Sequence, residues 1–119
     1  MSVRHQMRQR VERLFKLMID DPEFPKEDEA TVYVVFVPQE EGYEEEDIEV
    51  SEQEVFLEDR ESVKKFLDRT TREALEADVK GLKLASYVFE AGQELKIVSE
   101  EDLPQELVKT RIERMREEV

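Results

Sequence analysis

The sequence contains no cysteine, no asparagine and no tryptophan, and it has one histidine and three glycines among 119 residues. Without cysteine there is no disulfide bond, no thiolate nucleophile and no cysteine-based metal site. Three isolated glycines cannot build a glycine-rich phosphate loop, and no Gly-x-Ser-x-Gly nucleophile motif occurs. His5 stands near the start of a predicted helix, where a surface position is favoured over a catalytic one. We therefore expect no catalytic, cofactor-binding or metal-binding residue and a protein that is not an enzyme.

Long apolar runs are also missing, and no stretch approaches the roughly 18 apolar residues that a membrane-spanning helix needs. The first residues alternate charged and apolar side chains, without the apolar block of a secretory signal. These absences predict a cytoplasmic protein without membrane contact. The lack of asparagine beside 42% charged residues is expected of a thermophilic source, with compositional drift in a short chain as the alternative.

Basic residues are scarce in one third of the chain. Residues 20–59 hold seventeen acids and one basic residue, Lys26, whereas residues 1–19 hold five basic residues and one acid. Residues 60–119 are nearly balanced, with twelve basic residues and fourteen acids. Almost all of the net charge of −14 therefore comes from one segment, and we expect its carboxylates to gather on a single exposed side.

The most apolar run, Thr-Val-Tyr-Val-Val-Phe-Val at residues 31–37, predicts the central strand. β-branched and aromatic side chains occupy both alternating sets of positions, so we expect an inner strand that is covered on both faces. Pro38 should end this strand, because proline cannot donate a hydrogen bond to a sheet. One face should carry Thr31, Tyr33, Val35 and Val37, and the other Val32, Val34 and Phe36.

Helical spacing of apolar residues predicts amphipathic helices over residues 3–19, 60–80 and about 103–119. Each has end signals of the expected kind. The N-caps of the first two are Ser2 and Asp59, the second ends at Gly81, and the third has a capping box formed by Ser99 with Asp102 or by Asp102 with Gln105.

Three more strands are predicted. Residues 48–57 resemble a return strand that is interrupted near residues 51–53. Residues 82–90 alternate, with Leu82, Leu84, Ser86 and Val88 on one face and Lys83, Ala85, Tyr87 and Phe89 on the other, and a short turn leads into residues 94–98.

The whole predicts one α+β domain, residues 1–119, with about four strands in a mainly antiparallel sheet and three amphipathic helices in the order α-β-β-α-β-β-α. An acidic loop lies at about residues 39–54, and its like charges predict a mobile tip over residues 39–47.

The acidic loop is the feature that points to a function. Its carboxylates would substitute for nucleic-acid phosphates, so we predict a small acidic regulator or inhibitor, a DNA mimic of the kind that phages and mobile elements encode. Its partner would be a basic protein surface, as on a nucleic-acid-binding protein, with Tyr33, Tyr43 or Phe24 adding apolar contact. The predicted partner-binding residues are Glu40, Glu41, Tyr43, Glu44, Glu45, Glu46, Asp47 and Glu49. The alternative interpretation is a solvated face that only maintains solubility.

Two other functions stay open. A homo-oligomeric structural component, such as a homodimer, would associate through Ile112, Met115 and Val119, which remain in phase at the end of the last helix. A metal-dependent nuclease would use the acid-x-lysine spacings Asp78-x-Lys80 or Glu94-x-Lys96, which a charge-rich chain also produces by chance.

The basic first helix could touch phosphates through Arg4, Arg8 and Arg13. The neighbouring acids oppose the approach of nucleic acid, so we expect no direct nucleic-acid binding. Pairing of this helix with the acidic segment, within one chain or across a dimer, is the expected role of its arginines.

Overall fold

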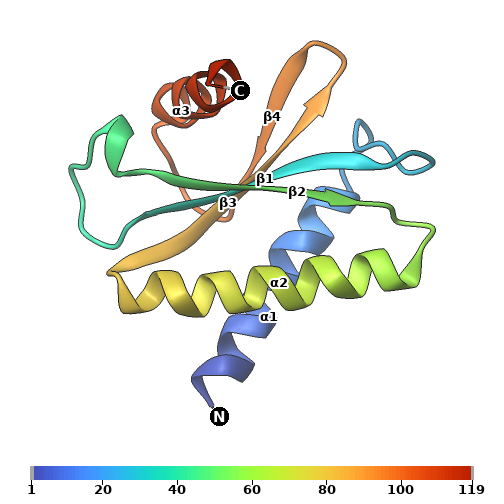
Figure 1. The fold of residues 1–119 in the computed structure, drawn as a ribbon, viewed down its shortest axis with the longest axis horizontal. Helices are drawn as coiled ribbons and strands as arrows, with labels where there is room; N and C mark the ends of the chain where they lie inside the picture. Colours follow the sequence, from blue (N-terminus) through green and yellow to red (C-terminus); the bar gives the residue numbers. More distant parts are fainter. Residues whose placement is uncertain (1, 119) are drawn as a thin grey trace.

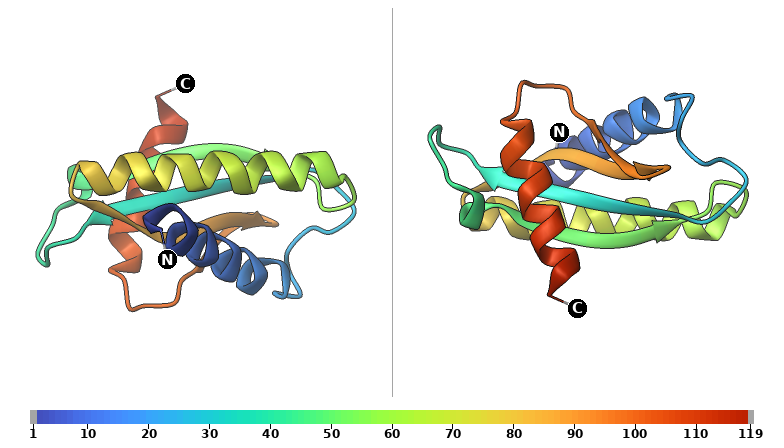
Figure 2. Two further views of the ribbon diagram at one scale, coloured as in Figure 1. Left: turned by 90° about the horizontal axis from the view of Figure 1, so that it is seen from below. Right: turned by 90° about the horizontal axis from the view of Figure 1, so that it is seen from above.

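The computed structural model describes residues 2–118, and it confirms the predicted α+β fold. The elements are α1 (Val3–Ile19), β1 (Ala30–Pro38), the short 3-10 helix η1 (Glu45–Asp47), β2 (Glu49–Val55), α2 (Arg60–Val79), β3 (Leu82–Ala91), β4 (Glu94–Val98) and α3 (Gln105–Glu117). All strand pairs are antiparallel, in the order β2-β1-β3-β4. Helices α1 and α2 cover one face of this sheet and α3 crosses the other (Figures 1 and 2).

β1 is the inner strand that its composition predicts. Val32, Val34 and Phe36 point into an apolar cluster with α1 and α2, and Tyr33 and Val35 point into a second cluster with α3. All five side chains are buried. A strand that is covered by helices on both faces has no solvent side, which explains the continuous apolar run.

A β-bulge in β3 changes which of its residues share a face. Val35 of β1 lies opposite Ser86, but the next residue, Phe36, lies opposite Leu84, so Ala85 is an extra residue in β3. The bulge places Tyr87 on the same face as Leu84, and the predicted strict alternation of this strand is wrong. The predicted interruption near residues 51–53 is also wrong, because β2 pairs with β1 without a shift in register.

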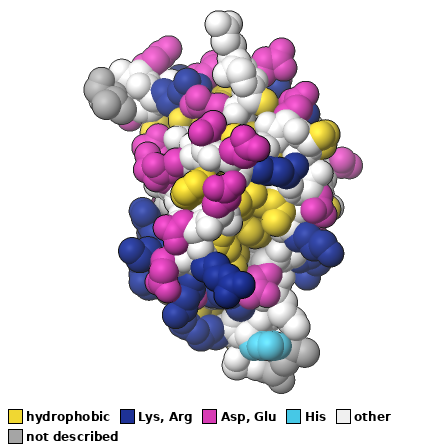
Figure 3. Space-filling model, turned by 90° about the vertical axis from the view of Figure 1, so that its right-hand side faces the viewer, with side chains coloured by type: hydrophobic (Ala, Val, Ile, Leu, Met, Phe, Trp, Pro, Cys, Tyr) yellow, Lys and Arg dark blue, Asp and Glu magenta, His cyan; other side chains and the backbone are white. Residues whose placement is uncertain are grey.

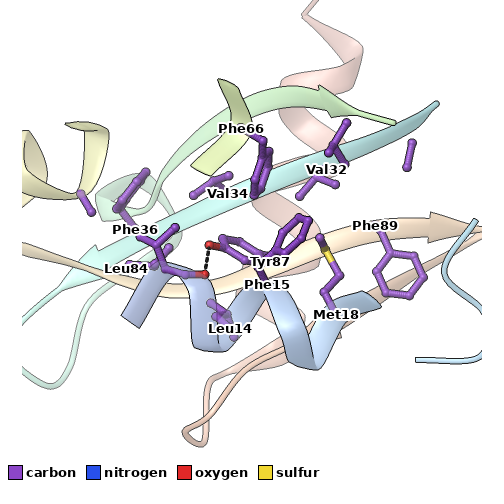
Figure 4. Packing of buried hydrophobic residues seen from close by; sticks show 14 of the residues in the cluster. Leu14, Phe15, Met18, Val32, Val34, Phe36, Phe66, Leu84, Tyr87 and Phe89 are labelled. Carbon is purple, nitrogen blue, oxygen red and sulfur yellow. Dashed lines mark hydrogen bonds between the residues drawn. The ribbon is translucent and has the colours of Figure 1, made fainter. Parts of the chain in front are cut away.

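Aromatic rings join the helices to the sheet in the cluster under α1 and α2 (Figure 4). The ring of Phe66 from α2 lies 5.4 Å from that of Phe15 on α1 and 5.5 Å from that of Tyr87 on β3, between ring centroids. The buried hydroxyl of Tyr87 donates a hydrogen bond to the carbonyl oxygen of Val11, at 2.9 Å. This bond connects α1 directly to the middle of the sheet.

The helix ends follow the predicted signals at three places out of four. The side chains of Ser2 and Asp59 accept hydrogen bonds from the first turns of α1 and α2, and Gly81 after α2 has a φ of 81°, a conformation that favours glycine. Neither predicted capping box of α3 forms, because Pro104 is the N-cap and makes no side-chain cap. The hydroxyl of Ser99 instead donates to the carbonyl oxygen of Ala85 in the bulge, at 2.8 Å.

Candidate protein-interaction surface

The carboxylates of residues 20–59 do not gather on one side. Residues 20–29 precede β1 and residues 39–48 follow it, so the two groups lie at opposite ends of the sheet (Figures 1 and 2). The acids of β2 lie between them, along one edge. The prediction of one acidic side is therefore wrong, and the acidic residues at each end of the sheet have different neighbouring residues.

The end that holds residues 20–29 is not purely acidic. Figure 3 shows this end, where acidic, basic and apolar side chains are mixed. The ammonium group of Lys96 lies 3.2 Å from a carboxylate oxygen of Glu23 and 3.8 Å from one of Asp21. Phe24 is buried and its ring meets that of Phe89 edge to ring, so it is not free to contact a partner. This end is the weaker candidate for binding a basic partner.

Residues 44–48, at the other end, form an acidic turn that is folded onto α3. The backbone N–H of Glu44 donates to the carboxylate of Asp47, at 2.9 Å. Ile48 is 1% exposed and belongs to the apolar cluster under α3, and Arg111 of α3 donates from its Nε to the carbonyl oxygen of Ile48, at 2.9 Å. Residues 44–47 of the predicted mobile tip therefore form a turn, and the buried Ile48 next to them anchors it on α3.

A hollow of about 500 Å³, which we call the acidic groove, lies beside this turn. Its charged lining consists of four carboxylates, Glu40, Glu41, Glu101 and Asp102, and one cation, Lys83. The rest of the lining is largely apolar and uncharged: Val37, Pro38, Gln39, Gly42, Tyr43, Leu103, Pro104 and Leu107. The groove therefore combines apolar lining with an excess of negative charge, the combination that suits an apolar side chain carrying a positive end.

The electrostatics of this end favour a cation. Burial raises the pKa of the Tyr43 hydroxyl, and the charge of Glu101 raises it further. A hydrogen bond with Glu44, together with the negative charge of Glu44, raises the pKa of Glu46. Lys83 lies 3.3 Å from Glu101, between the ammonium nitrogen and the carboxylate oxygen, and thus offsets one charge. A positive group in the groove would reduce the remaining repulsion.

The structure sorts the eight predicted partner-binding residues into three groups. Glu40, Glu41 and Tyr43 line the groove, and Glu44, Glu46 and Asp47 are on the adjoining turn. Of the three aromatic residues that we proposed for partner contact, Tyr43 alone is half-exposed, whereas Phe24 and Tyr33 are buried. Tyr33 is 2% exposed.

The two remaining residues, Glu45 and Glu49, face elsewhere. Glu45 turns toward α3 and its carboxylate lies 2.8 Å from the guanidinium of Arg114, and Glu49 begins β2 with a carboxylate 3.9 Å from the ammonium of Lys80. Neither contributes to the groove.

Sequence reasoning did not find the second wall of the groove. Glu101, Asp102, Leu103 and Leu107 belong to the connection from β4 to α3 and to the first turn of α3. The only local signal is a run of three acids, Glu100, Glu101 and Asp102, before a Leu-Pro step. These residues meet the loop after β1 because α3 crosses the face of the sheet, which no sequence spacing encodes.

Two of the three predicted self-association residues, Ile112 and Met115, do not form an exposed face. Ile112 is 0% exposed and packs with Val108 in the cluster under α3, so the prediction for Ile112 is wrong. Met115 is half-buried against the same cluster, and Val119 lies outside the described residues. The sheet covers this stripe of α3 because the helix lies directly across β1 and β3.

Two of the four arginines of α1, Arg8 and Arg13, pair with carboxylates outside the acidic loop. Arg8 contacts Asp68 at 2.6 Å and Glu12 at 2.8 Å, and Arg13 contacts Glu100 at 2.7 Å, each distance being between nitrogen and oxygen. The hydrogen bond from Arg8 lowers the pKa of Asp68. Pairing of this helix with the acidic segment, residues 20–59, within one chain is thus absent from the ion pairs of residues 2–118.

The two acid-x-lysine spacings are at different places. Lys80 lies beside Glu49 at the start of β2, and Lys96 lies beside Asp21 and Glu23 near the opposite end of the sheet. Within residues 2–118, no group of three or more histidine, aspartate or glutamate side chains is arranged to hold a metal ion. None of the helices in the described part of the chain is long and apolar enough to cross a membrane.

Comparison with known proteins identifies one family relationship. A protein of Aquifex aeolicus (strain VF5), described as an uncharacterized protein, is 47% identical over 121 residues, and the alignment covers all of both chains. The chain belongs to the same family as this Aquifex protein. No family model matches the sequence, and no solved structure matches it. The relationship extends the fold to the relative without assigning an activity to either protein.

Proposed function

We propose that this protein is a non-enzymatic interaction module that binds a basic surface of another protein in its acidic groove. The observation that carries the proposal is the lining of the groove, which combines four carboxylates and one lysine with a largely apolar remainder. Complementary charge steers a partner and fixes its orientation, while desolvated apolar contact supplies affinity. Both kinds of contact are available in this one hollow.

The groove is supported by ordered structure on both walls. On one wall, the loop after β1 continues into the acidic turn, which Ile48 and Arg111 hold on α3. On the other wall, Leu103 and Leu107 pack against the same apolar cluster. A preformed site loses less conformational entropy on binding than a disordered acidic loop would lose.

The partner class follows from the chemistry of the lining. Protein surfaces that bind nucleic acid present lysine and arginine to phosphates. Closely spaced carboxylates are negative like phosphates, so they can occupy the same basic surface. We therefore propose a small acidic regulator or inhibitor that occupies the basic surface of a nucleic-acid-binding protein. The field of exposed carboxylates is screened within about 8 to 10 Å at physiological ionic strength, so the partner must reach the groove itself.

Charge reversal with a matched control tests this proposal. Glu40→Lys/Glu41→Lys reverses two carboxylates of the groove, and Glu27→Lys/Asp28→Lys makes the same change in charge among exposed residues of the opposite end. Each protein is immobilised and used to capture partners from its host, and the captured protein is then purified and titrated against all three proteins by calorimetry.

The native protein and the control should bind the same basic protein. A short DNA duplex should compete for that basic protein and release it from both. The groove variant should bind it at least about tenfold more weakly, because two attractive contacts become repulsive. Equal affinity of the groove variant and the native protein would remove the groove as the binding site. If DNA fails to compete, the partner is not a nucleic-acid-binding protein, although the groove would still be the binding site.

A homo-oligomeric function is the second candidate, and a separate observation favours it. Helix α1 carries five basic residues and one acid, and its Val3 and Leu17 are 59% and 46% exposed. A second copy could place this helix against the acidic end of the first. Light scattering would then show the native protein as a discrete oligomer and the variant Glu40→Lys/Glu41→Lys as a smaller species. A native protein with the mass of a monomer would exclude the homo-oligomeric function.

A further inference from the structure

The outer edge of β2 is unpaired over its whole length. β2 pairs with β1 through seven consecutive residues, from Val55 opposite Ala30 to Glu49 opposite Phe36, and none of residues 2–118 pairs with its other side. The strand contains no proline, glycine or lysine and has no bulge, so it lacks several of the devices that blunt an edge.

The other edge of the sheet is less accessible to an added strand. β4 has five residues, and Lys96 in its middle is tied to Asp21 and Glu23 of the loop before β1. The two edges therefore differ in length and in cover, and β2 is the better template (Figure 2).

Hollows flank β2 on both faces of the sheet. On the side of α2, two adjoining grooves of about 670 and 410 Å³ share Glu52 and Arg69 in their linings. On the side of α3, a hollow of about 400 Å³ is lined by Tyr33, Glu52, Met115 and Arg116. Successive side chains of a strand point to opposite faces of a sheet. A strand laid along β2 would thus direct one set of side chains toward α2 and the other toward α3.

The charges on the α3 face select the kind of strand. Glu52 lies opposite Tyr33 and Glu54 opposite Thr31, which places both carboxylates on the α3 face, and both are exposed. A hydrogen bond with Glu29 and the negative charge of Glu29 raise the pKa of Glu54, so two carboxyl groups lie close together there. Residues directly across from these carboxylates on a neighbouring strand would be favourable as lysine or arginine and unfavourable as acids.

The α2 face is different, because the polar side chains that β2 places on it are already paired. The side chain of Gln53 is 4% exposed and donates to Thr70 and to Glu73, at 3.1 and 2.8 Å, and Ser51 donates to Glu73 at 2.9 Å. Lys65, Arg69 and Arg72 line the larger groove on this face, so uncharged side chains of an added strand suit it better than lysine or arginine. A second copy of β2 does not suit the edge, because its acids would lie against Glu52 and Glu54.

We propose that the edge of β2 binds an extended segment of another protein by strand addition, with lysine or arginine at alternate positions facing Glu52 and Glu54. Backbone hydrogen bonds to the edge supply affinity, and the alternating charge supplies specificity. This surface is distinct from the acidic groove, and the inference holds whether or not the groove binds a partner.

Two synthetic peptides of equal charge test the inference. One has lysine at every second position with valine or threonine between, and the other has proline in place of the uncharged residues, which removes backbone donors while keeping the lysines. Each is titrated into the ¹⁵N-labelled protein at low salt, with amide shifts and hydrogen exchange recorded. The first peptide should bind, shift the amides of β2 and slow their exchange, and the proline peptide should bind at least about tenfold more weakly.

Variants of the protein separate strand addition at β2 from general attraction. Glu52→Lys/Glu54→Lys should weaken binding of the first peptide about tenfold or more, and the milder Glu52→Gln/Glu54→Gln should weaken it by less. The control Glu94→Lys/Glu106→Lys, at exposed residues of β4 and α3 away from β2, carries the same charge as the first variant and should bind within about twofold of the native protein. Equal binding of both peptides, equal loss in the control, or no binding of the first peptide at millimolar concentration would each overturn the inference.

Discussion

The substitution Ile48→Ala should destabilise the protein by about 3 kcal/mol, although Ile48 directly follows a run of carboxylates. The side chain is 1% exposed and packs in the apolar cluster under α3. Alanine removes three carbon atoms, which at about 0.8 kcal/mol each lose roughly 2.4 kcal/mol of transfer free energy, and the cavity that remains adds to this loss. A domain with a total stability of about 5 to 15 kcal/mol would lose a large part of it.

Urea unfolding followed by far-ultraviolet circular dichroism measures this loss. The midpoint should fall while the slope stays unchanged, because the surface that unfolding exposes is nearly the same. For 119 residues, an unfolding entropy of about 2.1 cal/mol/K per residue converts 3 kcal/mol into a decrease in Tm of about 12 °C. Ile48→Val should cost about 0.5 to 1.5 kcal/mol, since it removes one carbon.

Val79→Ala is the matched control, because Val79 is 89% exposed and its truncation should change stability by less than about 0.5 kcal/mol. A similarly small effect of Ile48→Ala would refute the anchored turn. Residues 44–48 would then be attached only through hydrogen bonds and the Arg114 ion pair, and the acidic groove would lose one of its ordered walls.

Two further predictions concern a buried hydroxyl and a pair of carboxylates. Tyr87→Phe should lower the free energy of unfolding in urea by about 0.5 to 1.5 kcal/mol, because it removes the hydrogen bond to the carbonyl oxygen of Val11. The control Tyr43→Phe, in the groove, should lower it clearly less. Equal effects of the two substitutions would contradict the role of the Tyr87 hydroxyl. The hydrogen bond with Glu29 and the charge of Glu29 raise the pKa of Glu54, so the folded chain binds this proton more tightly than the unfolded chain, and stability rises as pH falls through the raised pKa. Glu54→Gln should therefore raise the urea midpoint at pH 7 and leave it nearly unchanged at pH 3, whereas an equal gain at both values would contradict the carboxylate pair.

Much of the fold could be predicted because its signals are local. The apolar run of β1 marked a strand with both faces buried, the stripes of α1 and α2 marked their inner faces, and Ser2, Asp59 and Gly81 marked helix ends. Each signal depends on a residue's own conformational preference or on the period of a helix or strand. Such preferences act over a few residues and are readable from the chain itself.

The acidic site could be predicted only in part. Tyr43 and the acids on either side of it were identified from charge density, but the orientation of each carboxylate was not. Glu45 turned inward because Arg114 lies on the adjacent turn of α3, and the partner wall at Asp102 came from a segment about sixty residues later. Contacts between distant segments depend on how helices cross the sheet, which periodicity does not specify.

Composition and periodicity alone determined the α+β class, the element order, the antiparallel pairing and the excess of acids in one third of the chain. Tertiary structure decided where those acids lie, since β1 carries the chain from one end of the sheet to the other and thereby separates residues 20–29 from residues 39–48. It also decided which face Tyr87 occupies, because one extra residue at Ala85 shifts the register between β1 and β3. The physical reason is the same in both cases. Local preferences set the conformation of each segment, whereas burial of both faces of one sheet sets the position of every segment relative to the others.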